Sequence, residues 1–207
     1  MFGSIELYAG VLIALFLAGF VIRILLRRRS IYTRKGIIDP LKVSIKDIDK
    51  MEDGKEFEEY LYRLFLALGY EDTYKTVSSR DFGADLVFTD RDGERNVIQA
   101  KRYAESNPVG LSAVQEIYSS MRYYGASKSI VIASSRYTEA CEILAGYNGV
   151  KLIDRSGLVE IIQLFKSNQI TSVMEMIEDE PEFILDLEER PPVGSRKVRL
   201  SSRERDG

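Results

Sequence analysis

The sequence predicts an α/β domain with a mixed sheet flanked by helices, preceded by one transmembrane helix. Three observations lead to this prediction. Helix-like and strand-like apolar patterns alternate through the middle of the chain, an Asp-Gly pair separates two strand-like segments, and an uncharged apolar run lies near the N-terminus. Of the 207 residues, 45% are hydrophobic and 29% are charged, which is typical of a globular chain rather than a disordered or fibrous one.

The N-terminal apolar run is expected to form a transmembrane helix over residues 5–26. Residues 7–22 carry no charge, and a span needs roughly 17–25 apolar residues, a length reached if Arg23 extends its charge toward the lipid headgroups. A signal peptide or a buried helix is the competing interpretation. Positive residues follow the run instead of preceding it, which is the reverse of a signal peptide. We therefore expect a single-pass protein of the cell membrane with the rest of the chain in the cytoplasm.

The segments on either side of a central domain, residues 51–167, are expected to be irregular. Residues 27–50 contain helix-breaking Gly and Pro and are expected to form a juxtamembrane linker, with a short strand at 41–45. Residues 168–207 are expected to be a mostly disordered tail, because an acidic block is followed there by a basic one.

The central domain is expected to begin with a helix over residues 54–68. Its apolar residues recur at helical spacing on one stripe, and Gly69 follows the last of them, as is usual at the end of a helix. After a short segment at 74–77, two strands are expected over 84–89 and 96–101. The Asp-Gly pair between them is a hairpin signal, so these two strands should lie side by side.

Helices and strands then alternate toward the end of the domain. Amphipathic patterns predict helices over 111–124, 138–145 and 158–165, and short apolar runs predict buried strands over 129–133 and 150–153. Such an alternation adds parallel strands to the hairpin, which is why the sheet is expected to be mixed.

Composition limits the chemistry that this chain can perform. Histidine is absent, which excludes a Ser-His-Asp triad and an HExxH zinc site. The single Cys141 cannot form an internal disulfide, so a reducing compartment is the simpler expectation. Residues 1–36 hold six basic side chains and one acidic one, so the net charge of −3 leaves an acidic body. An acidic body argues against a broad nucleic-acid surface but leaves room for a small metal-dependent site.

Asp85, Gln99 and Lys101 form the candidate catalytic site. Gln99 and Lys101 lie two residues apart on one strand and should face the same way, and the hairpin should bring Asp85 beside them. An acid, an amide and a lysine suit metal-assisted attack on a phosphodiester, in which oxygen ligands hold Mg²⁺ and the lysine orients water or offsets charge. Glu58, on the preceding helix, could supply a second carboxylate. The competing interpretation is an ordinary solvated strand, but a lysine among apolar neighbours needs a partner.

Other polar residues have weaker signals. Arg80, Arg102 and Lys128 are candidate DNA contacts, although ordinary surface charge explains them equally well. Gln115 and Glu116, on the helix after the hairpin, could contact metal or DNA, but a solvated helix face is the favoured interpretation.

Four segments of this domain together resemble the Mrr family, the type IV restriction endonuclease-like domains of the PD-(D/E)xK nuclease superfamily. They are GKEFE at 54–58, LGY at 68–70, DFGADL at 81–86 and QAKRY at 99–103, and the resemblance covers roughly residues 51–165. It implies a restriction endonuclease-like αβββαβ core, Mg²⁺-dependent DNA cleavage and often a preference for modified DNA.

The resemblance also implies roles for individual residues. Asp85 matches the metal-binding acid, Lys101 the catalytic lysine, and Gln99 the position that is variably Glu or Gln. Glu58 matches the acidic residue of the first helix, so the implied metal ligands are Asp85, Glu58 and Gln99. Gly83 matches a glycine that lets the backbone turn tightly before the metal-binding acid. Because Gln99 is neutral where much of the superfamily has a carboxylate, the metal would meet one fewer negative charge.

The sequence thus predicts a membrane-anchored, Mg²⁺-dependent endodeoxyribonuclease whose tether suggests restriction of foreign or modified DNA. Its expected partners are DNA, the membrane and a second copy of the chain, because double-strand cleavage by one small site usually calls for two copies. The alternative is a non-catalytic membrane adaptor that keeps the nuclease fold and binds nucleic acid or a protein partner. A nuclease acting on RNA or branched DNA would share the same site and stays open.

Overall fold

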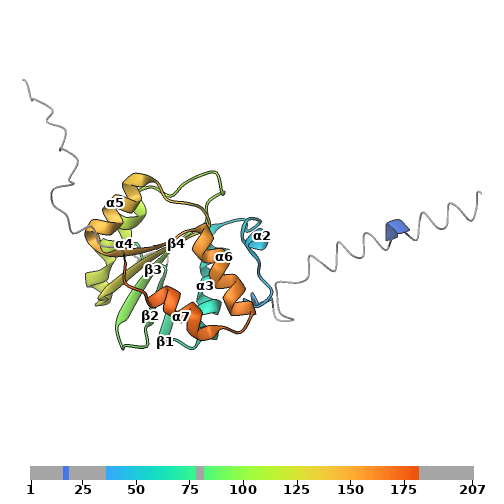
Figure 1. Ribbon diagram of the computed structural model, residues 1–207, viewed down its shortest axis with the longest axis horizontal. Helices are drawn as coiled ribbons and strands as arrows, with labels where there is room; N and C mark the ends of the chain where they lie inside the picture. The colour runs from blue at the N-terminus through green and yellow to red at the C-terminus, as the bar shows by residue number, and fades with distance from the viewer. Residues whose placement is uncertain (1–15, 19–35, 78–81, 182–207) are drawn as a thin grey trace, which may run out of the picture.

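A five-stranded mixed sheet forms the centre of the computed structural model, which describes residues 16–18, 36–77 and 82–181 (Figure 1). The strands, which lie in the order of the chain, are β1 (Glu71–Lys75), β2 (Leu86–Thr89), β3 (Arg95–Lys101), β4 (Lys128–Ala133) and β5 (Val150–Ile153). β1, β2 and β3 pair antiparallel, whereas β3, β4 and β5 pair parallel. The predicted mixed sheet is therefore confirmed.

Helices cover both faces of this sheet. They are α2 (Ile45–Ile48), α3 (Gly54–Leu68), α4 (Ser112–Tyr124), α5 (Glu139–Asn148), α6 (Arg155–Lys166) and α7 (Ile170–Glu178). α4 and α5 pack on one face, and α3, α6 and α7 lie on the other (Figure 1). The order α3, β1, β2, β3, α4, β4 is the αβββαβ order that the family resemblance implies.

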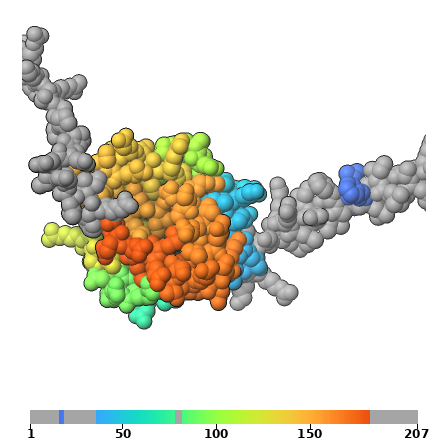
Figure 2. All heavy atoms as spheres, viewed as in Figure 1, coloured from blue at the N-terminus to red at the C-terminus, as the bar shows by residue number. Residues whose placement is uncertain are grey.

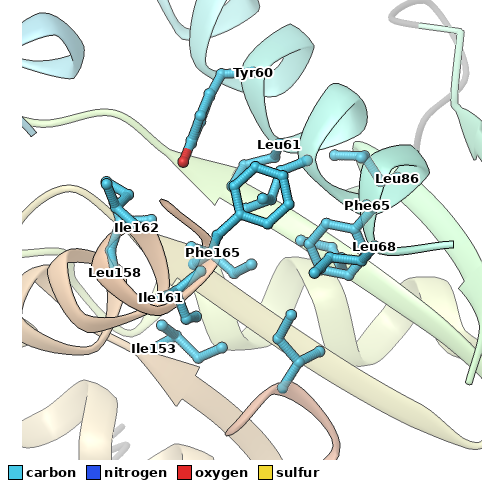
Figure 3. Close-up of a cluster of buried hydrophobic side chains, with 14 of the residues drawn as sticks. Tyr60, Leu61, Phe65, Leu68, Leu86, Ile153, Leu158, Ile161, Ile162 and Phe165 are labelled. Carbon is cyan, nitrogen blue, oxygen red and sulfur yellow. The ribbon is translucent and has the colours of Figure 1, made fainter. Parts of the chain in front are cut away.

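Alternate residues of β2, β3, β4 and β5 enter two separate cores. Leu86 and Ile98 belong to the larger core, which α3, α6 and α7 close. Figure 3 shows Tyr60 and Phe65 of α3 and Phe165 of α6 in this core. Val87 and Val97 belong to the smaller core under α4 and α5. This is the two-residue period of a strand buried on both faces, and it places Gln99, two residues after Val97, on the α4 side.

Several element boundaries agree with the sequence pattern. α3 spans the predicted residues: Asp53 caps its first turn by accepting a hydrogen bond from the Glu56 backbone N–H at 3.1 Å, and Gly69 ends it with a φ of 88°. β5 also has its predicted bounds, and the other central helices and strands agree within a few residues.

The predicted linker, 27–50, is wrong for its later part. Residues 41–45 do not form a strand; Ser44 instead begins the short helix α2. Ile38, Val43 and Ile48 are buried in the larger core, so the chain from residue 36 onward packs on the domain. These apolar residues are scattered among Gly, Pro and charged residues, which hid their burial.

The predicted tail, 168–207, is also wrong for its first part, because α7 extends the domain. Val173 and Ile177, one helical turn apart, are both buried in the larger core. Glu178 then accepts a hydrogen bond from the Arg91 Nε at 2.6 Å, which joins α7 to the β2–β3 hairpin. α6 and α7 form one broad face of the molecule beside α2 (Figure 2). The rest of the predicted tail, from residue 182, lies outside the described residues.

The predicted transmembrane helix, 5–26, also lies outside the described residues, apart from residues 16–18, which are helical. Within the described part of the chain, no helix combines the length and apolar character needed to span a membrane.

Candidate active site

The candidate site lies where the β2–β3 pair meets α4. Asp85 immediately precedes β2, and its backbone N–H donates to the carbonyl of Ile98 at 2.8 Å. Ile98 is also the residue that pairs with Leu86, so Asp85 lies beside β3 at the end of the regular β2–β3 ladder. The Asp85 carboxylate also accepts a hydrogen bond from the Ala100 backbone N–H at 2.7 Å. The acid is thereby tied to the strand that carries the other two predicted residues.

Gln99 and Lys101 project together toward α4, as their spacing predicts. The Gln99 Nε2 donates to Glu116 Oε2 at 2.8 Å, and the Lys101 Nζ lies 2.9 Å from the same oxygen. Gln99 is only 4% exposed, whereas the Lys101 side chain is 21% exposed. One carboxylate oxygen of Glu116 on α4 therefore accepts hydrogen bonds from both the Gln99 amide and the Lys101 ammonium of β3.

Gly83 brings the turn before Asp85 against the backbone of α4. Its φ is 94°, a conformation that residues with a side chain rarely adopt. A Cβ at this position would lie 2.6 Å from the backbone oxygen of Glu116 and 2.8 Å from the carbonyl carbon. Glycine is needed here both for the turn and for the close approach, so the turn role expected from the sequence is confirmed.

Gln99 also has a buried acceptor that is left unsatisfied. Its Oε1 is inaccessible to solvent and has no hydrogen-bond partner among the described residues. A buried polar atom without a partner costs about 1–3 kcal/mol, and such atoms are rare in folded proteins. An oxygen-binding cation would satisfy this atom, and Mg²⁺ binds carboxylate and amide oxygens. The residues present therefore fit a Mg²⁺ ion.

The charge state of Glu116 follows from its contacts. Partial burial favours the neutral acid, but the hydrogen bonds from Lys101 and Gln99 and the Lys101 charge outweigh it, so the pKa of Glu116 is lowered. Glu116 is therefore a carboxylate at neutral pH, within reach of the candidate metal ligands.

Glu58 makes no described contact with Gln99, Lys101 or Glu116, and its ion-pair partner Lys75 pairs with Leu86, the residue after Asp85. Glu58 is on α3, which packs on the other face of the sheet, and its Oε2 lies 4.0 Å from the Nζ of Lys75 on β1. Among the described residues, no three acidic, His or Cys side chains group closely enough to hold a metal ion by themselves. The carboxylate that the structure brings to Gln99 and Lys101 is that of Glu116.

The predicted DNA contacts are scattered. Lys128 begins β4 and pairs with Asn96, whereas Lys101 pairs with Ala133 at the other end, so Lys128 is far from the site along the strands. Its Nζ bonds to the buried carboxylate of Asp90 at 3.2 Å. The Arg102 guanidinium donates to the Met51 carbonyl. Arg80 lies outside the described residues.

Glu116 belongs to the site, whereas the sequence pattern favoured a place for it on a solvated helix face. A usable signal was present, because Glu116 lies three residues after Ala113 and four before Ser120, both fully buried. Residues at these spacings share one helix face. The Glu116 side chain lies at the edge of that face and is 45% exposed, and its carboxylate reaches across to Gln99 and Lys101.

Residues 48–162, more than half of the chain, match the family model Mrr_cat, which describes a restriction endonuclease domain. The chain belongs to this restriction endonuclease family. The resemblance of the four sequence segments to the Mrr family is thereby confirmed, and membership supports a nuclease. The matched residues include Asp85, Gln99, Lys101 and Glu116.

Solved structures similar to this member of the Mrr family share little sequence with it. The DNA modification-dependent restriction endonuclease AspBHI is 19% identical, with a TM-score of 0.45 over 64% of this chain and 38% of its own. The MspJI restriction endonuclease in complex with a 27-mer oligonucleotide is 15% identical, with a TM-score of 0.45 over 65% of this chain and 35% of its own. The chain thus spans well under half the length of either endonuclease. The comparison with curated proteins gave no match.

Proposed function

We propose that this protein is a membrane-anchored, Mg²⁺-dependent endodeoxyribonuclease that hydrolyses DNA phosphodiester bonds and restricts foreign or modified DNA. The observation that carries the proposal is the convergence of Asp85, Gln99 and Lys101 at one end of the β2–β3 pair. Membership of a restriction endonuclease family supports DNA as the substrate.

The proposed roles follow from the donor atoms. Asp85 and the Oε1 of Gln99 would hold Mg²⁺, which when bound polarises the phosphate and makes water a better nucleophile. The Lys101 ammonium would orient the attacking water and offset the negative charge that develops on the phosphate. Glu58 is the least supported member of the predicted ligand set, because its contact is with Lys75.

The buried acceptor on Gln99 favours an enzyme over the alternative, a non-catalytic membrane adaptor with the same fold. Among the described residues, the oxygens of Tyr60, Tyr70 and Ser129 and the Nε of Arg102 are also buried without a partner. Of these atoms, however, the Oε1 of Gln99 is the one whose own amide bonds to a carboxylate that also binds a lysine, a combination that a cation site uses and an adaptor does not need. The acidic body of the chain is the feature that favours the adaptor. RNA or branched DNA remains an alternative substrate for the same site.

The membrane anchor and the dimer rest on the sequence. The uncharged run at 7–22 followed by the basic residues 27–29 supports a single span with the nuclease domain in the cytoplasm. A homodimer would allow both DNA strands to be cut. Arg80 and Arg102, near the site in sequence, are better candidates for DNA contacts than Lys128, which bonds to Asp90.

Plasmid cleavage by the full-length protein in detergent micelles tests the proposal. We expect supercoiled DNA to be nicked or linearised with Mg²⁺, and to stay intact with EDTA or with the folded Asp85→Asn variant. Cleavage that persists in EDTA would refute metal dependence. Intact DNA with the folded wild-type protein, on both methylated and unmethylated plasmid, would favour the adaptor, and cleavage of RNA alone would change the substrate.

A further inference from the structure

We infer that Glu116 supplies the second carboxylate of the metal site, from α4, in place of the one that Gln99 lacks on β3. The inference rests on the proposed function, since it concerns the same site. It adds a ligand that the sequence motif does not contain, and it gives the neutral Gln99 a positioning role as well as a metal-binding one.

The position of the Gln99 amide is the first reason. Gln99 is 4% exposed, its Nε2 donates to Glu116 Oε2, and its Oε1 has no described partner. Both atoms belong to one terminal amide group, so the unsatisfied Oε1 belongs to the same side-chain end that bonds to the Glu116 carboxylate. This makes Glu116 the candidate to be the second ligand of a cation bound at Oε1.

The fixed relation between Glu116 and Asp85 is the second reason. The turn that leads to Asp85 packs through Gly83 directly on the backbone of Glu116. Asp85 also bonds to the backbone of Ala100, between the two β3 residues that bond to Glu116. Two independent contacts thus fix the position of Asp85 relative to Glu116, which is an arrangement that preorganises a cation site.

The charge of the cluster is the third reason. Without Glu116, the negative charge of Asp85 and the positive charge of Lys101 would cancel, and the site would have little attraction for a divalent cation. Glu116 leaves the cluster with one net negative charge while still accepting a hydrogen bond from Lys101. Oxygen ligands with negative charge are what Mg²⁺ binds in proteins.

Direct measurement of Mn²⁺ binding tests this inference without relying on activity. Binding is detected as a decrease in the electron paramagnetic resonance signal of free Mn²⁺. We expect Glu116→Gln in the full-length protein to weaken Mn²⁺ binding by at least about tenfold, because loss of even an outer-shell partner of a metal ligand typically costs about 10–100-fold. Glu160→Gln, the same change at an exposed position of α6, is the matched control and should bind as the wild type does. Circular dichroism establishes that each variant is folded.

An exchange of the two side chains provides a second test. In the double variant Gln99→Glu/Glu116→Gln, the acid and the amide change places, so the charge of the cluster is preserved. We expect Mn²⁺ binding to return to within about threefold of the wild type, because a carboxylate again stands beside Asp85. A double variant that binds no better than Glu116→Gln would overturn the inference.

The Asp85→Asn variant separates the inference from the proposed function. If Asp85→Asn abolishes Mn²⁺ binding while Glu116→Gln binds like the Glu160→Gln control, the inference fails and the proposed function stands. If neither Asp85→Asn nor Glu116→Gln weakens binding, the metal site itself fails, and the proposed function fails with it.

Discussion

Gly83→Ala is expected to destabilise the domain strongly, because two costs add at one position. Placing a residue with a side chain at a φ of 94° costs about 1–2 kcal/mol. The added Cβ would also lie 2.6 Å from the Glu116 backbone oxygen, and α4 cannot move away without disturbing its own core contacts. Overpacking of this kind costs roughly 1–3 kcal/mol more. The free energy of unfolding should therefore fall by about 2–5 kcal/mol.

Gly93→Ala provides the matched control, because Gly93 has a φ of 82° and a Cβ added there would meet no atom within 4 Å. Its free energy of unfolding should fall only by the cost of the backbone conformation, about 1–2 kcal/mol. Urea unfolding of both variants, followed by circular dichroism, measures the difference. In a thermal scan each 1 kcal/mol corresponds to roughly 2–4 °C of Tm for a domain of this size. Equal destabilisation of the two variants would refute the claim that the turn before Asp85 packs on α4.

Three further predictions concern the rest of the domain. Ile177→Ala should lower the free energy of unfolding by about 2–5 kcal/mol in urea, because α7 is part of the core; an unchanged midpoint would mean that it is not. Lys128→Met should change the dissociation constant for DNA, measured by fluorescence anisotropy, by less than about twofold, because Lys128 bonds to Asp90 away from the site. A larger loss of affinity would show that Lys128 contacts DNA. Burial alone would raise the pKa of Asp90, but bonds from Asn96, the Glu94 backbone and Lys128 outweigh it and lower the pKa. The ionised Asp90 should therefore stabilise the fold above about pH 4, the ordinary pKa of a carboxyl group, and this stabilisation should be lost as the pH falls below that value. In Asp90→Asn, the free energy of unfolding measured in urea should depend less on pH in this acid range.

The hairpin and the shared face of its polar residues were predictable because they depend on local rules. An Asp-Gly pair sets the β2–β3 turn, and the two-residue period of a strand sets the shared face of Gln99 and Lys101. Together these rules also bring Asp85 to the side of β3, where its carboxylate accepts from the Ala100 N–H. The bounds of α3 were predictable for the same reason, since its apolar stripe, its cap and its terminal glycine all lie within one segment.

The errors concern contacts between segments that are distant in sequence. α2 has only four residues, and α7, although it is rich in apolar residues, has only nine and runs into an acidic segment. Their burial in the larger core is what shows that they belong to the domain. The partnership of Glu116 with β3 joins residues 15 or 17 positions apart, and it depends on how α4 crosses the sheet. Sequence spacing likewise does not reveal that Lys128 meets the buried Asp90 at the end of the sheet away from Lys101.

The central claim is that Asp85, Gln99 and Lys101 form a hydrolytic centre, and the single-turnover rate of DNA cleavage tests it most directly. The full-length protein, in excess over an end-labelled duplex with Mg²⁺, would be compared with Lys101→Met and with Lys151→Met, a control lysine on β5 that bonds to the Asp179 backbone. We predict that Lys101→Met slows the chemical step by about 10²–10³-fold while DNA binding is retained, and that Lys151→Met cleaves at the wild-type rate. A folded Lys101→Met variant that cleaves as fast as the Lys151→Met control would contradict the account.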